Sequence, residues 1–294
     1  MGMKEVQQIL VPPPPHMVGD GFRVHNFFPG GYDMAPDRMS PFYLLDYNAK
    51  VEFSPREHPR GVGVHPHRGF ETVTIVYHGK IAHQDSRGNR GVIGAGDIQW
   101  MTAASGVLHQ EYHEAGFSRE GGIFQVVQLW INLPAKDKMS EPKYQSITNV
   151  QIPRYNLPDA AGQVEVVAGE FKGIRGVAKT FTPLELYHIH LRVQKSIRLS
   201  LPAEYNTGIL VIQGKVQVNE KEEAPADHFI LFKNKGEEIF LKATEKDTIL
   251  LLLSGEPIRE PIVAYGPFLM NTKDEILQAY HDLNSGKFGT LEDK

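Results

Sequence analysis

The sequence of 294 residues contains no cysteine. Disulfide bonds, iron–sulfur clusters and thiol catalysis are therefore excluded, and the composition fits a reducing compartment, so we expect a cytoplasmic protein. No stretch approaches the ~18 consecutive apolar residues of a membrane-spanning helix. The N-terminal residues also lack an apolar signal core followed by a cleavage site. We therefore expect no association with a membrane.

Basic residues are also few and dispersed. The formal net charge is -4 and the pI is near 6.4. The sequence has no run of lysine or arginine that could bind along a phosphate backbone. This charge pattern argues against nucleic acid as a direct partner.

Helical patterning is almost absent before the C-terminus. There Thr272 and Glu275 form a capping box, an apolar stripe follows, and Gly286 can end the helix; the stripe consists of Ile276, Leu277, Tyr280 and Leu283. The rest of the chain has the short β-branched and aromatic runs of strands. Their ranges are 73–77, 98–101, 124–133, 187–193, 208–218, 229–232 and 248–254. The sequence predicts an all-β protein with a short C-terminal helix.

A charged, proline-punctuated segment, residues 134–153, is the best candidate for a domain boundary. An internal repeat supports this division, because residues 76–81 (VYHGKI) resemble residues 211–216 (VIQGKV). We therefore predict an N-terminal domain over 1–133, a linker over 134–153, and a C-terminal domain over 154–294.

Histidines are concentrated in one region of the chain. Seven of the thirteen lie there: His58, His65, His67, His78, His83, His109 and His113. Two of them form His65-Pro66-His67, and a third begins His109-Gln110-Glu111. Side chains two positions apart on a strand point to the same side, so each pair can present two donors to one point. Three imidazoles and a carboxylate favour a mid-to-late transition metal over calcium or magnesium.

The repeat predicts that only one half of the chain holds this donor set. A separation of 135 residues aligns His65 and His67 with Ser200 and Pro202. A separation of 130 residues aligns His109 and Glu111 with Ile239 and Leu241. None of these four residues of the second half can replace the metal donor with which it is aligned. The second half should keep the barrel without the metal donors.

Several motifs together resemble the pirin family of the cupin superfamily. They are HPHRGFET at 65–72, GDIQWMTA at 96–103, QLWINLP at 128–134, GEPI at 255–258 and YGPF at 265–268. The resemblance extends from about Phe22 to Phe288. It implies a bicupin with two β-barrels face to face and one iron in the N-terminal barrel, held by His65, His67, His109 and Glu111.

The resemblance also implies two kinds of function. One is a quercetin 2,3-dioxygenase activity, an oxidoreductase reaction that opens a flavonol ring with O₂ and releases carbon monoxide. The alternative is a non-enzymatic regulatory protein that binds a transcription factor or a metabolic enzyme in a manner dependent on the redox state of iron. A third reading, a zinc-bearing structural cupin, predicts a closed four-coordinate site.

The identity of the carboxylate ligand is open between two residues. Glu111 is favoured because it shares a strand face with His109; ordinary cupins instead use the position of Glu71, which would otherwise contact the site or the substrate. Gln128 alternates with Trp130 and is a candidate to point into the cavity, whereas Trp130 and Trp100 are expected in the core. The pair His188 and His190 has no second donor pair, so a solvent-facing or hydrogen-bonded role is expected.

The donor set defines a chemical hypothesis. A bound metal would lower the pKa of a substrate hydroxyl, and a carboxylate, Glu111 or Glu71, would take the proton. Fe²⁺ is the expected cofactor, although the ligands would also accept manganese, cobalt, nickel, copper or zinc. The expected substrates are a small flavonol-like aromatic molecule and O₂. Because the duplication supplies both barrels in one chain, we expect a monomer.

Overall fold

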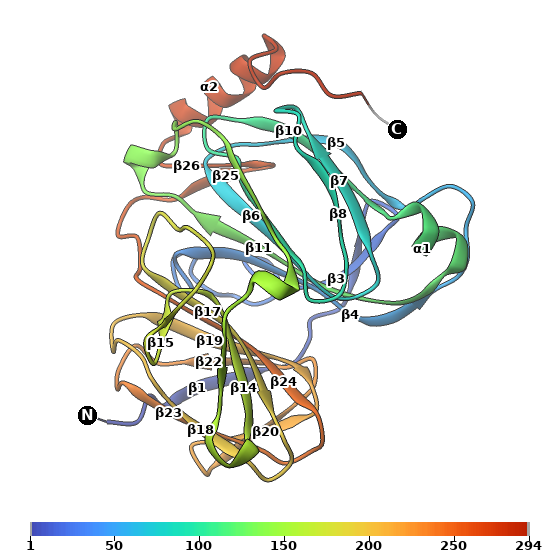
Figure 1. Ribbon diagram of the computed structural model, residues 1–294. Coiled ribbons are helices and arrows are strands. Elements are labelled where there is room, and N and C mark those ends of the chain that lie inside the picture. The colour runs from blue at the N-terminus through green and yellow to red at the C-terminus, as the bar shows by residue number, and fades with distance from the viewer. Residues whose placement is uncertain (1, 293–294) are drawn as a thin grey trace. The chain divides into compact units, whose positions relative to one another are not determined.

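The computed structural model describes residues 2–292 and consists mainly of β-strands (Figure 1). The prediction of an all-β bicupin with a C-terminal helix is confirmed. Among the described residues, no helix has both the length and the apolar character needed to cross a bilayer.

The chain forms two compact units, and each contains one barrel. The N-terminal barrel unit comprises Pro14–Asp37, Phe42–Asn149 and the chain from Ile258 onward. The C-terminal barrel unit comprises the chain up to Pro13, Arg38–Pro41 and Val150–Pro257. The sequence-based ranges differ from these units at both ends of the chain, because the N-terminal strand pairs within the C-terminal barrel and the C-terminal helix packs within the N-terminal barrel.

Two sheets build the N-terminal barrel, and a hairpin and two helices accompany them. The seven-stranded sheet has the order β12 (Lys143–Ile147), β9 (Ile98–Thr102), β6 (Phe70–His78), β11 (Gly122–Asn132), β4 (Phe42–Phe53), β3 (Phe22–Phe28) and β2 (His16–Val18). The four-stranded sheet has the order β5 (Gly61–His67), β10 (Val107–His113), β7 (Ile81–Asp85) and β8 (Arg90–Ile93). The remaining strands and α-helices are β25 (Val263–Tyr265), β26 (Phe268–Met270), α1 (Ala115–Glu120) and α2 (Lys273–Asn284), and a short 3₁₀ helix, η1 (Ala135–Asp137), follows β11.

The C-terminal barrel repeats this plan. Its seven-stranded sheet has the order β1 (Val6–Leu10), β22 (Phe229–Phe232), β19 (Asn206–Gln213), β24 (Thr248–Gly255), β17 (Leu184–Leu191), β14 (Gly162–Ala168) and β13 (Arg154–Asn156). Its four-stranded sheet has the order β18 (Ser196–Ser200), β23 (Glu238–Ala243), β20 (Lys215–Val218) and β21 (Glu222–Pro225). A short hairpin pairs β15 (Glu170–Phe171) with β16 (Ile174–Arg175).

Side chains fill the interior of the C-terminal barrel. Every second residue of β18 and β23 is buried, as expected for strands with one face on a core. The strand register pairs Ile239 with Leu199, as it pairs His109 with His65 in the other barrel. Leu199 and Leu201 therefore occupy the places of His65 and His67. Each lies one residue before the position, Ser200 or Pro202, that was predicted from a separation of 135 residues. Leu199, Leu201 and Ile239 are apolar and buried, so a metal would find no donors there.

Two local expectations need correction. Part of the predicted linker is a strand, because β12 pairs with β9 at the edge of the N-terminal sheet. The terminal helix has the predicted capping box on Thr272, but Leu277 is exposed and Ala279 is buried in its place.

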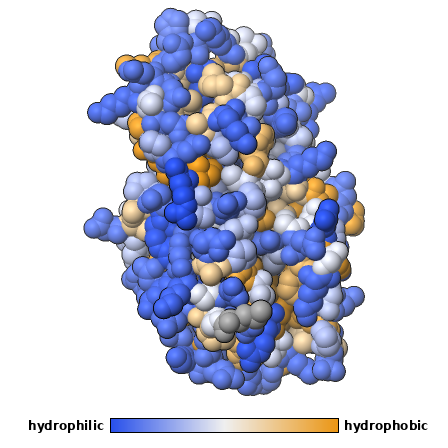
Figure 2. Space-filling model, turned by 90° about the vertical axis from the view of Figure 1, so that its left-hand side faces the viewer, coloured by the Kyte–Doolittle hydropathy of each residue, from blue (hydrophilic) through white to orange (hydrophobic). Residues whose placement is uncertain are grey.

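On the face shown in Figure 2, hydrophobic residues form separate patches within a largely hydrophilic surface.

Candidate metal centre

Three imidazoles converge from two adjacent strands of the N-terminal barrel. His65 and His67 lie on β5, and His109 lies opposite His65 on the antiparallel strand β10. The donor atoms of the three rings all lie within 4.8 Å of one another, and this is the only such group found among residues 2–292. The register shifts just beyond His109, where Glu111 pairs with Val62. Such a bulge changes the direction in which neighbouring side chains point.

The imidazole nitrogens fit a transition metal. Nδ1 of His65 lies 2.8 Å from the carbonyl oxygen of Gly63. If Nδ1–H donates to this carbonyl, Nε2 keeps its lone pair, as in many metal-bound histidines. Within residues 2–292, both ring nitrogens of His109 and Nδ1 of His67 are buried without a hydrogen bond. Buried polar atoms are rarely left in this state unless a further group satisfies them.

Glu111 lies at the edge of this group. Its Oε2 is 3.3 Å from Nε2 of His109. Its Oε1 accepts a hydrogen bond from Thr74 (3.0 Å), and its Oε2 accepts one from Gln128 (2.9 Å). Burial raises the pKa of Glu111, but the nearby charges of His109, His65 and His83 outweigh it and lower the pKa to about 2. The side chain is therefore a carboxylate at neutral pH.

A cavity of about 360 Å³ opens beside these donors. Its volume falls within the range of roughly 300–1,000 Å³ that is usual for small-molecule sites. The polar lining comes from His65, His67, Glu111, Asp46, Asn48, Thr74 and Gln128. The apolar lining includes Val18, Phe22, Val24, Val62, Val126 and Trp130. Trp130, expected in the core, stacks on Phe70 with ring centroids 4.1 Å apart and presents an edge to His67.

The structure brings Gln128 to the cavity but does not bring Glu71 there. Gln128 donates to Glu111, as described above. Glu71 lies three residues before Thr74 on β6, and therefore on the opposite face of the strand. Its Oε1 accepts a hydrogen bond from Thr102 (2.7 Å), and burial raises its pKa to about 7.

Two further histidines of the N-terminal barrel unit, His83 and His113, are buried in strands. His83 lies on β7 opposite Glu111, and its Nε2 contacts the hydroxyl of Tyr144. Burial lowers the pKa of His83 to about 4. His113 packs among aromatic rings and bonds to the carbonyl of Gly21. Burial alternates with period 2 along β7, and on β10 His113 lies two and four residues after Glu111 and His109, a spacing that the sequence could have indicated.

A glycine turn connects β5, which carries His65 and His67, to β6. Gly69 has a φ of 91°, and a Cβ at this position would lie 2.0 Å from the carbonyl oxygen of Leu269. Glycine is therefore required between His67 and the start of β6. This explains the glycine in the motif at 65–72.

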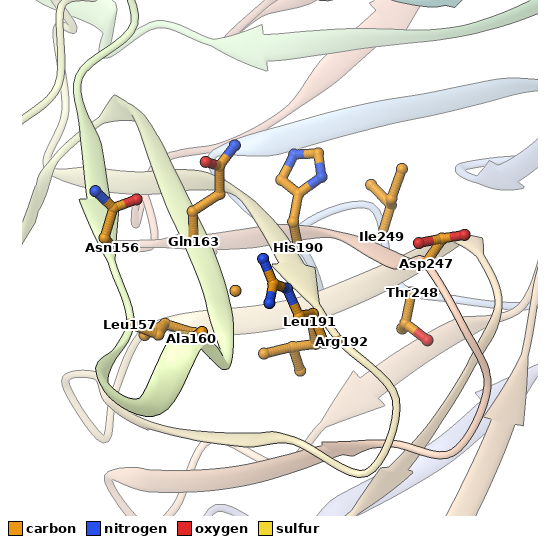
Figure 3. A pocket seen from close by; sticks show the side chains of 11 residues that line it. Asn156, Leu157, Ala160, Gln163, His190, Leu191, Arg192, Asp247, Thr248 and Ile249 are labelled. Carbon is orange, nitrogen blue, oxygen red and sulfur yellow. The ribbon is translucent and has the colours of Figure 1, made fainter.

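The C-terminal barrel unit has a second cavity, of about 570 Å³ (Figure 3). His190 and Arg192 line it, and Glu165 lies behind His190, with Oε2 3.5 Å from Nε2 of His190 and 3.3 Å from Nδ1 of His188. Within the described residues these groups do not converge as the three imidazoles of the first barrel do. His188 thus has the hydrogen-bonded role expected for this pair, and His190 lies near the same carboxylate.

Comparison with known proteins assigns the chain to a family. The pirin model matches residues 21–131, and the model of the pirin C-terminal cupin domain matches residues 186–289. The chain belongs to the pirin family. A relative from Pseudomonas aeruginosa, provisionally named a quercetin 2,3-dioxygenase, is 45% identical over 97% of this chain and 99% of its own length. A pirin-like protein from Solanum lycopersicum is 39% identical over 85% of this chain and 82% of its own length.

Solved structures agree with this assignment. A crystal structure of quercetin 2,3-dioxygenase from Acinetobacter baumannii has 44% sequence identity to this chain and a TM-score of 0.92. The match covers 99% of this chain and 100% of the Acinetobacter chain. A bacterial pirin from Escherichia coli in complex with nickel(II) has 22% sequence identity and a TM-score of 0.64. The match covers 85% of this chain and 99% of the Escherichia coli chain. The second likeness bears on the fold alone.

Proposed function

We propose that this pirin is a metal-dependent dioxygenase that cleaves flavonols such as quercetin with O₂ and releases carbon monoxide. The observation that carries the proposal is the convergence of three imidazoles beside a cavity with an aromatic wall. The names of the relatives from Pseudomonas and Acinetobacter support the choice of substrate. A cytoplasmic location and a monomeric state belong to the same proposal.

In this proposal His65, His67 and His109 hold the metal, and Glu111 completes the donor set. Fe²⁺ is the proposed ion, because imidazole and carboxylate ligands suit redox-active metals of this size. When bound, it would act as a Lewis acid toward a substrate oxygen and supply the redox chemistry that a reaction with O₂ requires. Glu111 could accept a proton from the substrate only when it is not occupied as a ligand.

The protein's own residues have three further roles. The carboxylate of Glu111 is fixed by Thr74 and Gln128, so it cannot rotate freely toward other groups. Trp130 and the cluster of valines and Phe22 offer flat, apolar contact to an aromatic ring. The same apolar lining lowers the local dielectric and strengthens the interactions of charged groups inside the cavity.

The test is turnover by protein of known metal content. Purified protein is loaded with Fe²⁺ under anaerobic conditions, its metal is quantified, and quercetin and O₂ are added. We expect loss of the flavonol absorbance and one carbon monoxide for each quercetin consumed. The variant His109→Ala should lose both metal and turnover, whereas His58→Ala, at an exposed position of the same barrel unit, should keep both.

Failure of fully iron-loaded protein to consume quercetin would overturn the proposal. Binding of a transcription factor or metabolic enzyme that depends on the iron redox state, without turnover, would establish the regulatory alternative. A site that holds zinc with four protein ligands, and that admits no exogenous ligand, would establish the structural alternative.

A further inference from the structure

A row of polar side chains crosses the seven-stranded sheet next to the metal site. In the register, Asn26 lies opposite Asp46, Asp46 opposite Gln128, and Gln128 opposite Thr74. Directly opposite residues share one face of a sheet and lie one strand spacing, ~4.8 Å, apart. Asp46, Gln128 and Thr74 line the same cavity as His65, His67 and Glu111. Asp46 is thus a second carboxylate that lines the cavity. It lies on the strand next to Gln128, the residue that donates a hydrogen bond to Glu111.

The two carboxylates differ in what their oxygens already bind. Both oxygens of Glu111 accept hydrogen bonds, and Oε2 also faces His109. Asp46 accepts one hydrogen bond, at Oδ1 from Nδ2 of Asn26 (2.7 Å). Its Oδ2 accepts none from the residues that the structure describes. Asn26 is itself held, because its Oδ1 accepts from the backbone N–H of Gly30 and its Nδ2 also donates to the carbonyl of Phe28. One oxygen of Asp46 is therefore fixed, and the other is available on a side chain that lines the cavity.

Burial also affects the basicity of Asp46. Burial raises the pKa of Asp46 above that of an ordinary aspartate, and the hydrogen bond from Asn26 and the charge of His16 offset only part of this rise. Glu111, in contrast, is a proposed metal ligand, and both of its oxygens already accept hydrogen bonds. A base works best when its pKa approaches the working pH, so Asp46 is better suited to receive a proton from a hydroxyl.

We propose that Asp46 is the catalytic base of this site and that its free oxygen takes the proton from the flavonol hydroxyl. This inference rests on the proposed dioxygenase function. In the step, the O–H bond of the flavonol breaks and its electron pair stays on the flavonol oxygen. A new O–H bond forms at Oδ2 of Asp46. The proton returns to solvent after the product leaves, so the carboxylate is regenerated and no oxidant beyond O₂ is needed.

The first experiment measures the ionisation of the bound substrate without turnover. Iron-loaded wild-type protein and the variant Asp46→Asn are mixed with quercetin in the absence of O₂. The flavonol anion absorbs at longer wavelength than the neutral molecule, so the spectrum reports the proton transfer. We expect the anion in wild-type protein and mainly the neutral flavonol in Asp46→Asn at neutral pH, with the metal content unchanged.

The second experiment measures turnover. Asp46→Asn should lower kcat by ~100-fold or more, within the range for loss of a general base, and should change KM little. Its kcat should rise with pH, because hydroxide in solvent then removes the proton. Asp46→Glu should recover part of the activity. Asp33→Asn, the same substitution at an exposed aspartate of the same barrel unit, should leave both the spectrum and kcat unchanged.

The outcomes separate this inference from the function on which it rests. If wild-type protein consumes quercetin and Asp46→Asn does so equally well with the same anion spectrum, Asp46 is not the base and the dioxygenase proposal stands. If Glu111→Gln retains the metal and alone abolishes the anion, the base is Glu111. If iron-loaded wild-type protein neither binds nor consumes a flavonol, the proposed function and the role of Asp46 are both overturned.

Discussion

The guanidinium of Arg68 forms a buried ion pair with the carboxylate of Asp282, with Nη1 and Oδ2 3.0 Å apart. Arg68 directly follows His67, and Asp282 lies on α2, more than 200 residues later in the chain. Nε of Arg68 also donates to the carbonyl of Ser105, and the guanidinium lies over the ring of Phe288. These contacts connect the C-terminal helix to the backbone next to His67, one of the three converging imidazoles.

Breaking this pair should destabilise the protein and loosen the metal site. In Asp282→Asn the guanidinium of Arg68 stays buried without its charged partner, which typically costs about 3–5 kcal/mol. We expect a loss of this size in the free energy of unfolding, measured by urea denaturation, and weaker metal binding through the displaced His67. Lys287→Ala removes the exposed partner of the same carboxylate and should cost less than about 1 kcal/mol. Equal effects of the two variants would show that the buried pair has no special role.

Removal of one imidazole should distinguish the metal site from the other histidine pair. His109→Ala takes away one of the three converging donors, and we expect metal affinity, measured by competition with a chelator, to fall by at least ~100-fold. His190→Ala, in the C-terminal barrel unit, is the matched control and should bind metal as the wild type does. Stoichiometric, tight metal in His109→Ala would mean that the ligand assignment is wrong.

The convergence of the three imidazoles was predictable because its signal is local. Period-2 alternation in His65-Pro66-His67 and in His109-Gln110-Glu111 indicates which side chains share a face before any pairing is known. The strand register that joins β5 to β10 then brings the two pairs together. The repeat likewise predicted an apolar second barrel, although a single-residue difference in separation between the halves shifted the correspondence by one position.

The residues that surround the metal site were less predictable, because long-range pairing creates their roles. Thr74 and Asp46 face the cavity only because β6, β11 and β4 lie side by side, and no local motif marks either residue. Trp130 has the pattern of a core residue, since one face of its ring is packed on Phe70. Local sequence also does not predict that the N-terminal strand belongs to the C-terminal barrel unit and that the C-terminal helix belongs to the N-terminal barrel unit. Sequence patterns specify strands and faces, and the chain topology decides which faces meet.

Metal binding should tolerate acid better than free imidazole does. Burial lowers the pKa of His65, and it lowers the pKa of His67 well below 6.5. Both rings therefore stay neutral, the form that binds metal, at pH values where an ordinary histidine is protonated. We expect affinity for a divalent probe such as Ni²⁺, measured by calorimetry, to change little between pH 8 and pH 6.5. A tenfold loss across that interval would contradict the assigned environment of the rings.

The same lowered pKa values have a consequence for stability without metal. The unfolded chain takes up protons at these histidines below about pH 6.5, whereas the folded protein resists doing so. Acidification therefore favours the unfolded state. The free energy of unfolding of the metal-free protein should fall as the pH drops below 6.5, and His67→Gln should reduce this dependence.

Glu71 provides a test with the opposite sign. Its folded pKa of about 7 exceeds the ordinary value of 4.5, so the folded state favours the protonated form. The stabilising contribution is complete below pH 4.5 and is lost as the pH rises through 7. Glu71→Gln keeps an oxygen that can accept from Thr102 but carries no charge. It should therefore be more stable than the wild type at pH 8, by an amount on the order of 3 kcal/mol, and nearly equal at pH 5.

The measurement is chemical denaturation of both proteins at the two pH values, with Glu52→Gln, an exposed glutamate of the same barrel unit, as the control. The control should show no pH-dependent gain. Because Glu71 faces away from the cavity, Glu71→Gln should also bind metal as the wild type does. A stability difference that stays constant with pH would mean that Glu71 is already ionised in the folded protein at pH 5, and loss of metal would mean that the carboxylate reaches the imidazoles after all.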